Sequence, residues 1–192
     1  MIQIIGVVEV FIFYIAYFLK LFKQKWTGII TNQLGKGKKP EKTIIIEKLL
    51  RVASTIIAVV ILASTILNHT IISNYMLRWV GLILFGSGTT LFVIAMLTMQ
   101  DNWRAGIPDV DKTSMVTSGI YKISRNPAFL GFDLTYIGAS MAFGSIILYI
   151  LTIFTIILMH LQILEEEKFL EDTFGNEYLS YKQRVGRYFV LF

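Results

Sequence analysis

Residues 118–131 read SGIYKISRNPAFLG and residues 165–167 read EEE, and each of these polar or charged stretches borders a long apolar segment. Polarity is costly beside a lipid-facing segment, so such stretches mark a membrane surface or a functional site. Pro127 disfavours helical geometry at Asn126 and is itself well placed to begin a helix. We therefore expect a membrane helix to begin at Pro127 and the two stretches to meet at one membrane face.

The composition is that of an integral membrane protein. Charged residues make up 16% of the chain, against roughly 25% in soluble domains, and hydrophobic residues make up 55%. The apolar residues cluster into runs of about 20, the length that crosses a bilayer. The length suits one membrane domain, residues 1–192. Because the chain has no cysteine, disulfides, thiolate metal sites and cysteine nucleophiles are excluded.

Hydropathy predicts an all-α fold with about five transmembrane helices. Three of them fall within residues 1–99, at 2–22, 44–67 and 79–99. The last apolar stretch, 129–164, would be about 50 Å long as a single helix, whereas the hydrocarbon core is about 30 Å thick. We therefore expect a break at Gly144-Ser145 and a helical hairpin, with one helix ending near Phe143 and the next starting near Ile146. Residues 100–192 then hold a long loop, this hairpin and a C-terminal tail.

Some residues inside the apolar runs carry information of their own. Gly81, Gly86 and Gly88 fall in the third predicted helix, where small residues let membrane helices approach closely. Gly175 suits the C-terminal cap of the last long helix. Glu9 lies in the first apolar run, and such a carboxylate is either functional or close enough to the N-terminus to reach the interface.

The basic residues assign the two sides. The predicted helices put segments 23–42, 100–128 and 165–192 on one side, and of the Lys and Arg residues only Arg78 falls on the other. By the positive-inside rule the shared face is cytoplasmic and the N-terminus lies outside. We expect a multi-pass protein surrounded by membrane lipids, with its site and C-terminus on the cytoplasmic side. The same distribution explains the net positive charge without a nucleic-acid partner.

The turn before the fourth predicted helix is the first candidate site. A helix N-terminus presents free N–H groups to anionic ligands, and Arg125 adds a forked donor. The alternative is an interfacial belt in which Tyr121, Arg125 and Phe129 sit at headgroup level.

The acidic triplet is the second candidate site. Neighbouring helix positions point in different directions, so the three carboxylates cannot all serve one ligand, while Gln162 and Glu166 share a face at i, i+4. A carboxylate here suits a ligand ammonium group or ribose hydroxyls. The alternative is a solvated acidic cap that pairs with nearby lysines.

Several other kinds of chemistry lack their motifs. His160 has no second histidine nearby and no HExxH pattern, so we expect no metal site. The chain has neither GxxxxGK[ST] nor GxGxxG, and no plausible Ser-His-Asp set, so phosphate-loop NTPase, Rossmann and hydrolase functions have no support.

The order GIYKISRNPAFLG, then EE, then FGNEYLSYKQRVGR resembles the isoprenylcysteine carboxyl methyltransferase family and its phospholipid-methyltransferase relatives. The resemblance covers residues 102–187, and the N-terminal half is similar only in hydropathy. It implies a small integral membrane enzyme that uses S-adenosylmethionine to methylate a lipophilic small-molecule or lipidated acceptor.

Carried over by position, the resemblance implies a set of cofactor-binding residues but assigns no catalytic residue. Together with Arg125, the set is Thr113, Ser114, Met115, Val116, Tyr121, Asn126, Pro127, Ala128, Phe129, Glu166 and Glu167. Gln162 stands near the substrate, at a position where members of the family often have arginine. Asn126 and Phe129 replace the family's histidine and tyrosine. A carboxylate acceptor would want a cation at Gln162, so the acceptor stays open.

Two other functions are compatible with the sequence. Some membrane sterol reductases, which use NADPH, resemble the C-terminal helix arrangement. A small membrane adaptor or transport accessory protein would need no cofactor at all. Binding of S-adenosylmethionine or NADPH to the purified protein distinguishes these alternatives.

Overall fold

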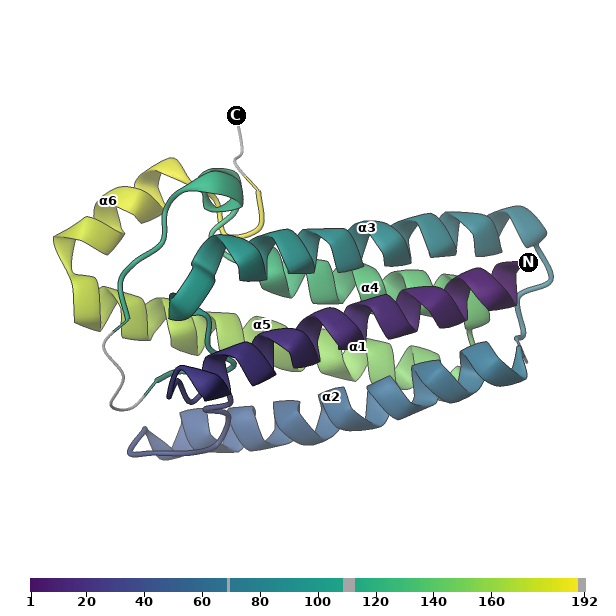
Figure 1. Ribbon diagram of the computed structural model, residues 1–192, viewed down its shortest axis with the longest axis horizontal. Helices are drawn as coiled ribbons and strands as arrows, with labels where there is room; N and C mark the ends of the chain where they lie inside the picture. The colour runs from purple at the N-terminus through teal and green to yellow at the C-terminus, as the bar shows by residue number, and fades with distance from the viewer. Residues whose placement is uncertain (69, 109–112, 190–192) are drawn as a thin grey trace.

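The computed structural model describes residues 1–68, 70–108 and 113–189, and its long helices form a bundle (Figure 1). The elements are α1 (Ile2–Trp26), α2 (Glu41–Leu67), α3 (Tyr75–Met99), η1 (Gln100–Asn102), η2 (Gly119–Lys122), α4 (Pro127–Phe143), α5 (Ile146–Phe174) and α6 (Asn176–Arg184). Helices α1 to α5 run along the long axis of the bundle, and α6 folds back from the end of α5 (Figure 1).

The apolar helices follow the predicted pattern. Four of the helices in the described residues are long and apolar enough to cross a membrane, namely α1, α2, α3 with its short η1 extension, and α5. Helix α4 starts at Pro127 and ends at Phe143, and α5 starts at Ile146, so the expected start and the expected break lie where predicted. With 17 residues, α4 is shorter than these four helices, and a fifth membrane crossing stays a prediction.

The ends of the bundle differ in charge. The connection from α1 to α2, the chain that leaves α3 and helix α6 lie together at one end, and the N-terminus lies at the other end beside the α2–α3 connection (Figure 1). Arg78 belongs to this second end, where its Nε donates to the carbonyl of Ala142 at 2.7 Å. The predicted basic segments are thus grouped at one end of the molecule. Which end faces the cytoplasm stays a prediction.

Glycines bring α3 and α4 into backbone contact. A Cβ atom added at Gly88 would lie 2.6 Å from the carbonyl oxygen of Gly131, and one added at Gly81 would lie 2.7 Å from that of Gly138. Gly81 and Gly88 therefore do what small residues were expected to do in the third helix. Gly86 faces α1 instead, since its Cβ would lie 2.9 Å from Glu9 Oε1. The close contact between α3 and α4 holds the first turns of α4 beside α3.

Two features of this end differ from what the sequence suggested. Glu47 was not among the candidate residues, yet its exposed fraction is 0% and it lies inside the protein. The predicted C-terminal tail contains a further helix, α6, directly after Gly175. Gly175 does cap α5, with a φ of 50° that favours glycine.

Gly88→Ala tests the α3–α4 contact. The new methyl group would press on backbone atoms of α4 that cannot rotate away, so we expect the free energy of unfolding to fall by about 1–3 kcal/mol. Thermal unfolding of the purified chain in detergent measures this. Ser87→Ala is the matched control because Ser87 is exposed on the same helix and donates to Ile83 of that helix. Equal melting temperatures for the two variants would argue against the contact.

Candidate functional site

A cavity of about 530 Å³ lies at the basic end of the bundle. Its lining comes from α1, α2, the segments that follow α1 and α3, the start of α4, the end of α5, and α6. This volume falls in the range of ligand-binding sites, roughly 300–1,000 Å³. The cavity is therefore the first place to look for the residues that the sequence selected.

Most of the predicted site residues line this cavity. They are Thr113, Ser114, Met115, Val116, Tyr121, Arg125, Asn126, Ala128, Phe129, Gln162 and Glu166. Two predicted cofactor residues are not part of the lining. Pro127 is buried as the first residue of α4, and Glu167 turns toward two arginines.

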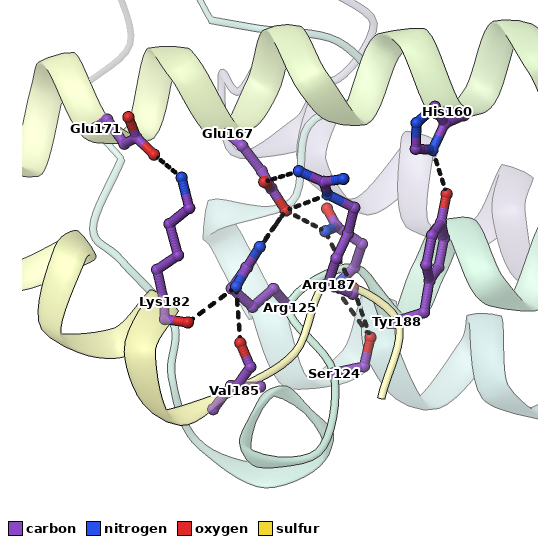
Figure 2. Close-up of polar contacts among 10 residues, drawn as sticks. Ser124, Arg125, His160, Glu167, Glu171, Lys182, Val185, Arg187 and Tyr188 are labelled. Atoms are coloured by element: carbon purple, nitrogen blue, oxygen red, sulfur yellow. Dashed lines mark hydrogen bonds and ion pairs between the residues drawn. The ribbon is translucent and has the colours of Figure 1, made fainter. Parts of the chain in front are cut away.

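Glu167 is the centre of a buried charge cluster (Figure 2). Its Oε1 accepts from Arg125 Nη2 at 2.9 Å and from Asn126 Nδ2 at 3.1 Å, and its Oε2 accepts from Arg187 Nη2 at 3.0 Å. The side chains of Glu167 and Arg125 are only 5% and 7% exposed. Glu167 therefore joins the end of α5 to the turn before α4 and to the C-terminal tail.

Arg125 and Asn126 also bind backbone carbonyls of this tail. Arg125 Nη1 donates to the carbonyl oxygen of Val185 at 2.7 Å, and Asn126 Nδ2 donates to that of Arg187 at 3.2 Å (Figure 2). The backbone N–H of Arg125 donates to the carbonyl of Gly186 at 3.1 Å. Both side chains thus line the cavity and hold its wall in place.

The three neighbouring glutamates point to different partners, as their helix positions predicted. Glu165 accepts from Lys42 Nζ at 2.7 Å and from Thr43 Oγ1 at 2.6 Å, both at the start of α2. Glu166 accepts from Gln162 Nε2 at 3.0 Å and lines the cavity. In the described parts of the chain, no lysine or arginine lies within ion-pair distance of Glu166.

Glu47 on α2 organises the opposite wall, and the sequence reasoning missed it. Its Oε2 pairs with Lys39 Nζ at 2.6 Å, and its Oε1 accepts from the backbone N–H of Ile107 at 2.9 Å. The segments 31–33 and 103–105 also meet here, where the backbone N–H of Gln33 donates to the carbonyl of Ala105 at 2.8 Å. A carboxylate directly after the apolar run Ile44–Ile46 of a membrane helix was the signal that could have found Glu47.

The cavity wall contains polar atoms that the protein does not satisfy. In the described residues, the buried Gln162 Oε1, Trp103 Nε1 and Tyr178 hydroxyl have no hydrogen-bond partner, and all three side chains line the cavity. Buried polar atoms are nearly always paired, so such atoms indicate a ligand or water. Burial raises the pKa of Tyr178 above its usual range, so its hydroxyl keeps its proton and can donate at neutral pH.

Tyr178 and Tyr181 of α6 were absent from the predicted site. Tyr178 is almost fully buried at the cavity, and the Tyr181 hydroxyl donates to the carbonyl of Tyr121 at 2.6 Å. Burial raises the pKa of Tyr181 to about 12. Sequence reasoning did not select these tyrosines, because the aromatic and basic pattern of the tail is also typical of an interfacial segment.

The part of the cavity lining that comes from α1 and α2 is mostly apolar, and we call it the apolar arm. Its lining side chains are Phe13, Tyr14, Tyr17, Phe18, Leu21, Leu50, Arg51, Ser54, Thr55 and Ala58. Phe18, Arg51 and Thr55 are exposed, so this part of the lining reaches the surface between the two helices. The site thus combines a polar end under α6 with an apolar arm open toward the sides of the bundle.

Comparisons with known proteins find methyltransferases. Protein-S-isoprenylcysteine O-methyltransferase of Rattus norvegicus is 33% identical over 110 residues, which are 55% of this chain and 38% of that protein. Methanethiol S-methyltransferase of a Pseudomonas sp. (strain GM41) is 36% identical over 88 residues, 45% of this chain and 32% of that protein. The chain spans less than half the length of these relatives.

A solved structure has the same fold over most of this chain. The eukaryotic intramembrane Ras methyltransferase ICMT (isoprenylcysteine carboxyl methyltransferase) aligns with a TM-score of 0.52 and 23% identity, covering 78% of this chain and 52% of that one. Together with the four apolar helices, this fold identifies an integral membrane protein.

A family model covers the part of the chain that forms the polar end of the cavity. The model described as phospholipid methyltransferase matches residues 76–177, which is just over half of the chain. This stretch runs from the start of α3 to the start of α6 and includes both the turn before α4 and the acidic triplet. The chain therefore belongs to the phospholipid methyltransferase family.

Proposed function

We propose that this chain is a membrane methyltransferase that uses S-adenosylmethionine and methylates a lipophilic acceptor. The family and the relatives are all methyltransferases, whereas nothing among them supports the NADPH-dependent reductase. The relative named as acting on isoprenylcysteine is in keeping with a lipidated acceptor, and the one named for methanethiol leaves a small thiol open.

The observation that carries the proposal is the state of Glu166. It is a carboxylate at the cavity without a cationic partner in the described residues, whereas Glu165 and Glu167 both have one. Such a group favours a cationic or hydrogen-bond-donating ligand. S-adenosylmethionine offers an ammonium group, a sulfonium and ribose hydroxyls.

The other unsatisfied atoms fit the same ligand in kind. Gln162 Oε1 is an acceptor for a hydroxyl or ammonium group, while Trp103 Nε1 and the Tyr178 hydroxyl are donors for a carboxylate or ring nitrogen. A site that presents both acceptors and donors to one cavity suits a zwitterionic nucleoside. We assign the polar end of the cavity, including residues 113–116 and 121–129, to the cofactor.

When bound, the cofactor supplies an activated methyl group on its sulfonium sulfur. The protein then has to align the acceptor with that methyl, and positioning of this kind is worth about 7–11 kcal/mol. The apolar arm between α1 and α2 would hold the acceptor chain, and burial of the reacting atoms would exclude water. A carboxylate acceptor needs no general base, whereas a thiol or amine must lose a proton first.

The proposal includes the membrane arrangement. The basic end of the bundle, with the cavity and the C-terminus, faces the cytoplasm by the positive-inside rule. Helices α4 and α5 form a hairpin that places both ends of the cofactor site at that face. Membrane lipids then surround the opening between α1 and α2, from which the acceptor enters.

A methyl-transfer assay tests the activity itself. The purified full chain in phospholipid nanodiscs is given radiolabelled S-adenosylmethionine and a panel of a prenylated cysteine, an aminophospholipid, a long-chain thiol and a quinol. We expect label in at least one lipid-soluble product. Saturable binding of NADPH without binding of S-adenosylmethionine would instead identify a reductase, and binding of neither would favour the accessory protein.

Glu166→Gln tests the assigned cofactor contact. Loss of a charge-assisted hydrogen bond of about 1.5–3 kcal/mol should weaken S-adenosylhomocysteine binding about 10- to 100-fold. Thermal stability without ligand should not fall, because the removed charge has no cationic partner. Equilibrium binding and thermal unfolding in detergent measure both quantities. Glu165→Gln is the matched control, and an equal loss of affinity in that variant would remove Glu166 from the site.

Glu167→Gln separates a wall-holding role from a cofactor contact. The substitution leaves the buried Arg125 and the half-buried Arg187 against a neutral amide, and breaking a buried pair costs about 3–5 kcal/mol. Glu165→Gln should cost less than about 1 kcal/mol, because its partner Lys42 is 72% exposed. Unfolding measured without ligand gives both values. A fully stable Glu167→Gln variant that binds no cofactor would show that the resemblance assigned Glu167 correctly as a direct contact.

A further inference from the structure

Arg51 is a guanidinium in the apolar arm of the cavity. It lies on α2, and its neighbours in the lining include Phe18 and Leu21 of α1 and Ser54 and Ala58 of α2. The Arg51 side chain is exposed at the surface and also belongs to the cavity lining, so it stands at the rim of the arm. A charged side chain within a membrane-spanning helix usually faces a cavity or the interface and marks a ligand pathway, so a ligand that enters the arm would meet this guanidinium.

The described residues supply no side-chain partner for Arg51. Of the arginines in the lining, Arg125 is bound by Glu167, and Arg104 donates to the carbonyls of Asp101 and Trp103. The Arg51 guanidinium makes no side-chain hydrogen bond or ion pair with the parts of the chain that the structure describes. Among the described residues, Arg51 is therefore a cation in the cavity lining without a side-chain partner.

Arg51 lies on the same face of α2 as Glu47, and Glu47 is hydrogen-bonded toward the polar end. It stands one helical turn beyond Glu47, so the two side chains start about 6 Å apart. Glu47 Oε1 accepts from Gln162 Nε2 at 3.4 Å, and the same amide group donates to Glu166 at 3.0 Å. Arg51 and the proposed cofactor contact at Glu166 thus line the same cavity, and Glu47 and Gln162 lie between them in this sequence of neighbours.

We infer that Arg51 binds the anionic group of an amphiphilic acceptor, whose apolar chain lies along α1 in the arm. This inference rests on the proposed function and names its substrate class. The planar guanidinium fork matches a carboxylate or a phosphate in a two-pronged contact, and both anions share the required chemistry. Tyr14, Phe18 and Leu21 provide an apolar surface for the chain. An uncharged lipid would leave Arg51 without a partner in the cavity.

The cofactor's own carboxylate is the competing anion. The apolar neighbours of Arg51 in the lining favour a lipid, whereas the unsatisfied Tyr178 donor lies on α6. Binding of the lipid anion and binding of the cofactor carboxylate predict different results for Arg51→Ala. If Arg51 served the cofactor, Arg51→Ala would weaken nucleoside binding and leave lipid binding unchanged.

Binding of matched amphiphiles to the full chain in neutral detergent tests the inference. One pair is an S-prenylated N-acetylcysteine and its uncharged amide, and the other is hexadecyl phosphate and hexadecanol. We expect the anion of at least one pair to bind about tenfold or more tightly than its uncharged partner. Arg51→Ala should reduce this ratio to about one, and Arg51→Lys should keep part of it. The pair with the larger ratio identifies the carboxylate or the phosphate.

Lys48→Ala is the matched control, because Lys48 is an exposed cation one turn earlier on α2 and is not part of the lining. It should keep the wild-type ratio, and Arg51→Ala should bind S-adenosylhomocysteine as the wild type does. An anion preference that survives in Arg51→Ala, or a loss of S-adenosylhomocysteine binding there, overturns the inference. If the wild type binds S-adenosylhomocysteine but shows no anion preference, the inference about Arg51 is wrong and the proposed function stands. Arg51-dependent anion binding without S-adenosylhomocysteine binding refutes the proposed function and leaves a site for anionic amphiphiles.

Discussion

The cavity depends on one buried carboxylate, Glu167, and the cations around it. A charge this far from water is tolerated only when opposite charges and hydrogen bonds surround it, and Glu167 has both in Arg125, Arg187 and Asn126. These partners come from the turn before α4 and from the C-terminal tail, which no local preference would bring to the end of α5. Because breaking the cluster would leave several buried groups unpaired, it holds the three segments in one arrangement.

This cluster also explains how adjacent, chemically identical residues take different roles. Successive residues of α5 point about 100° apart, so each glutamate meets a different neighbour. Glu165 reaches Lys42 at the surface, Glu167 reaches the arginines in the interior, and Glu166 faces the cavity. The alternative of an acidic cap that pairs with lysine thus describes Glu165. The carboxylate that remains for a ligand is Glu166, which has no lysine or arginine within ion-pair distance among the described residues.

The N-terminal half contributes more to the site than its hydropathy suggested. Glu47 fastens the connection after α1 to the segment after α3, and α1 and α2 form the apolar arm. The family model begins at residue 76 and does not include these elements. The apolar arm therefore comes from the part of this chain that the family model does not describe.

The sequence by itself determined the helices and their breaks, while the residues expected at the polar end came from the family resemblance. The helices and breaks follow from local causes: apolar runs of membrane length, Pro127 at a helix start, Gly144 at a turn and Gly175 at a cap. Only the tertiary structure decided that Glu47 is buried, that α6 covers the cavity and that Glu166 rather than Glu167 faces it. Those outcomes depend on which distant charges meet, and the charge pattern along the chain is equally compatible with residues solvated at an interface.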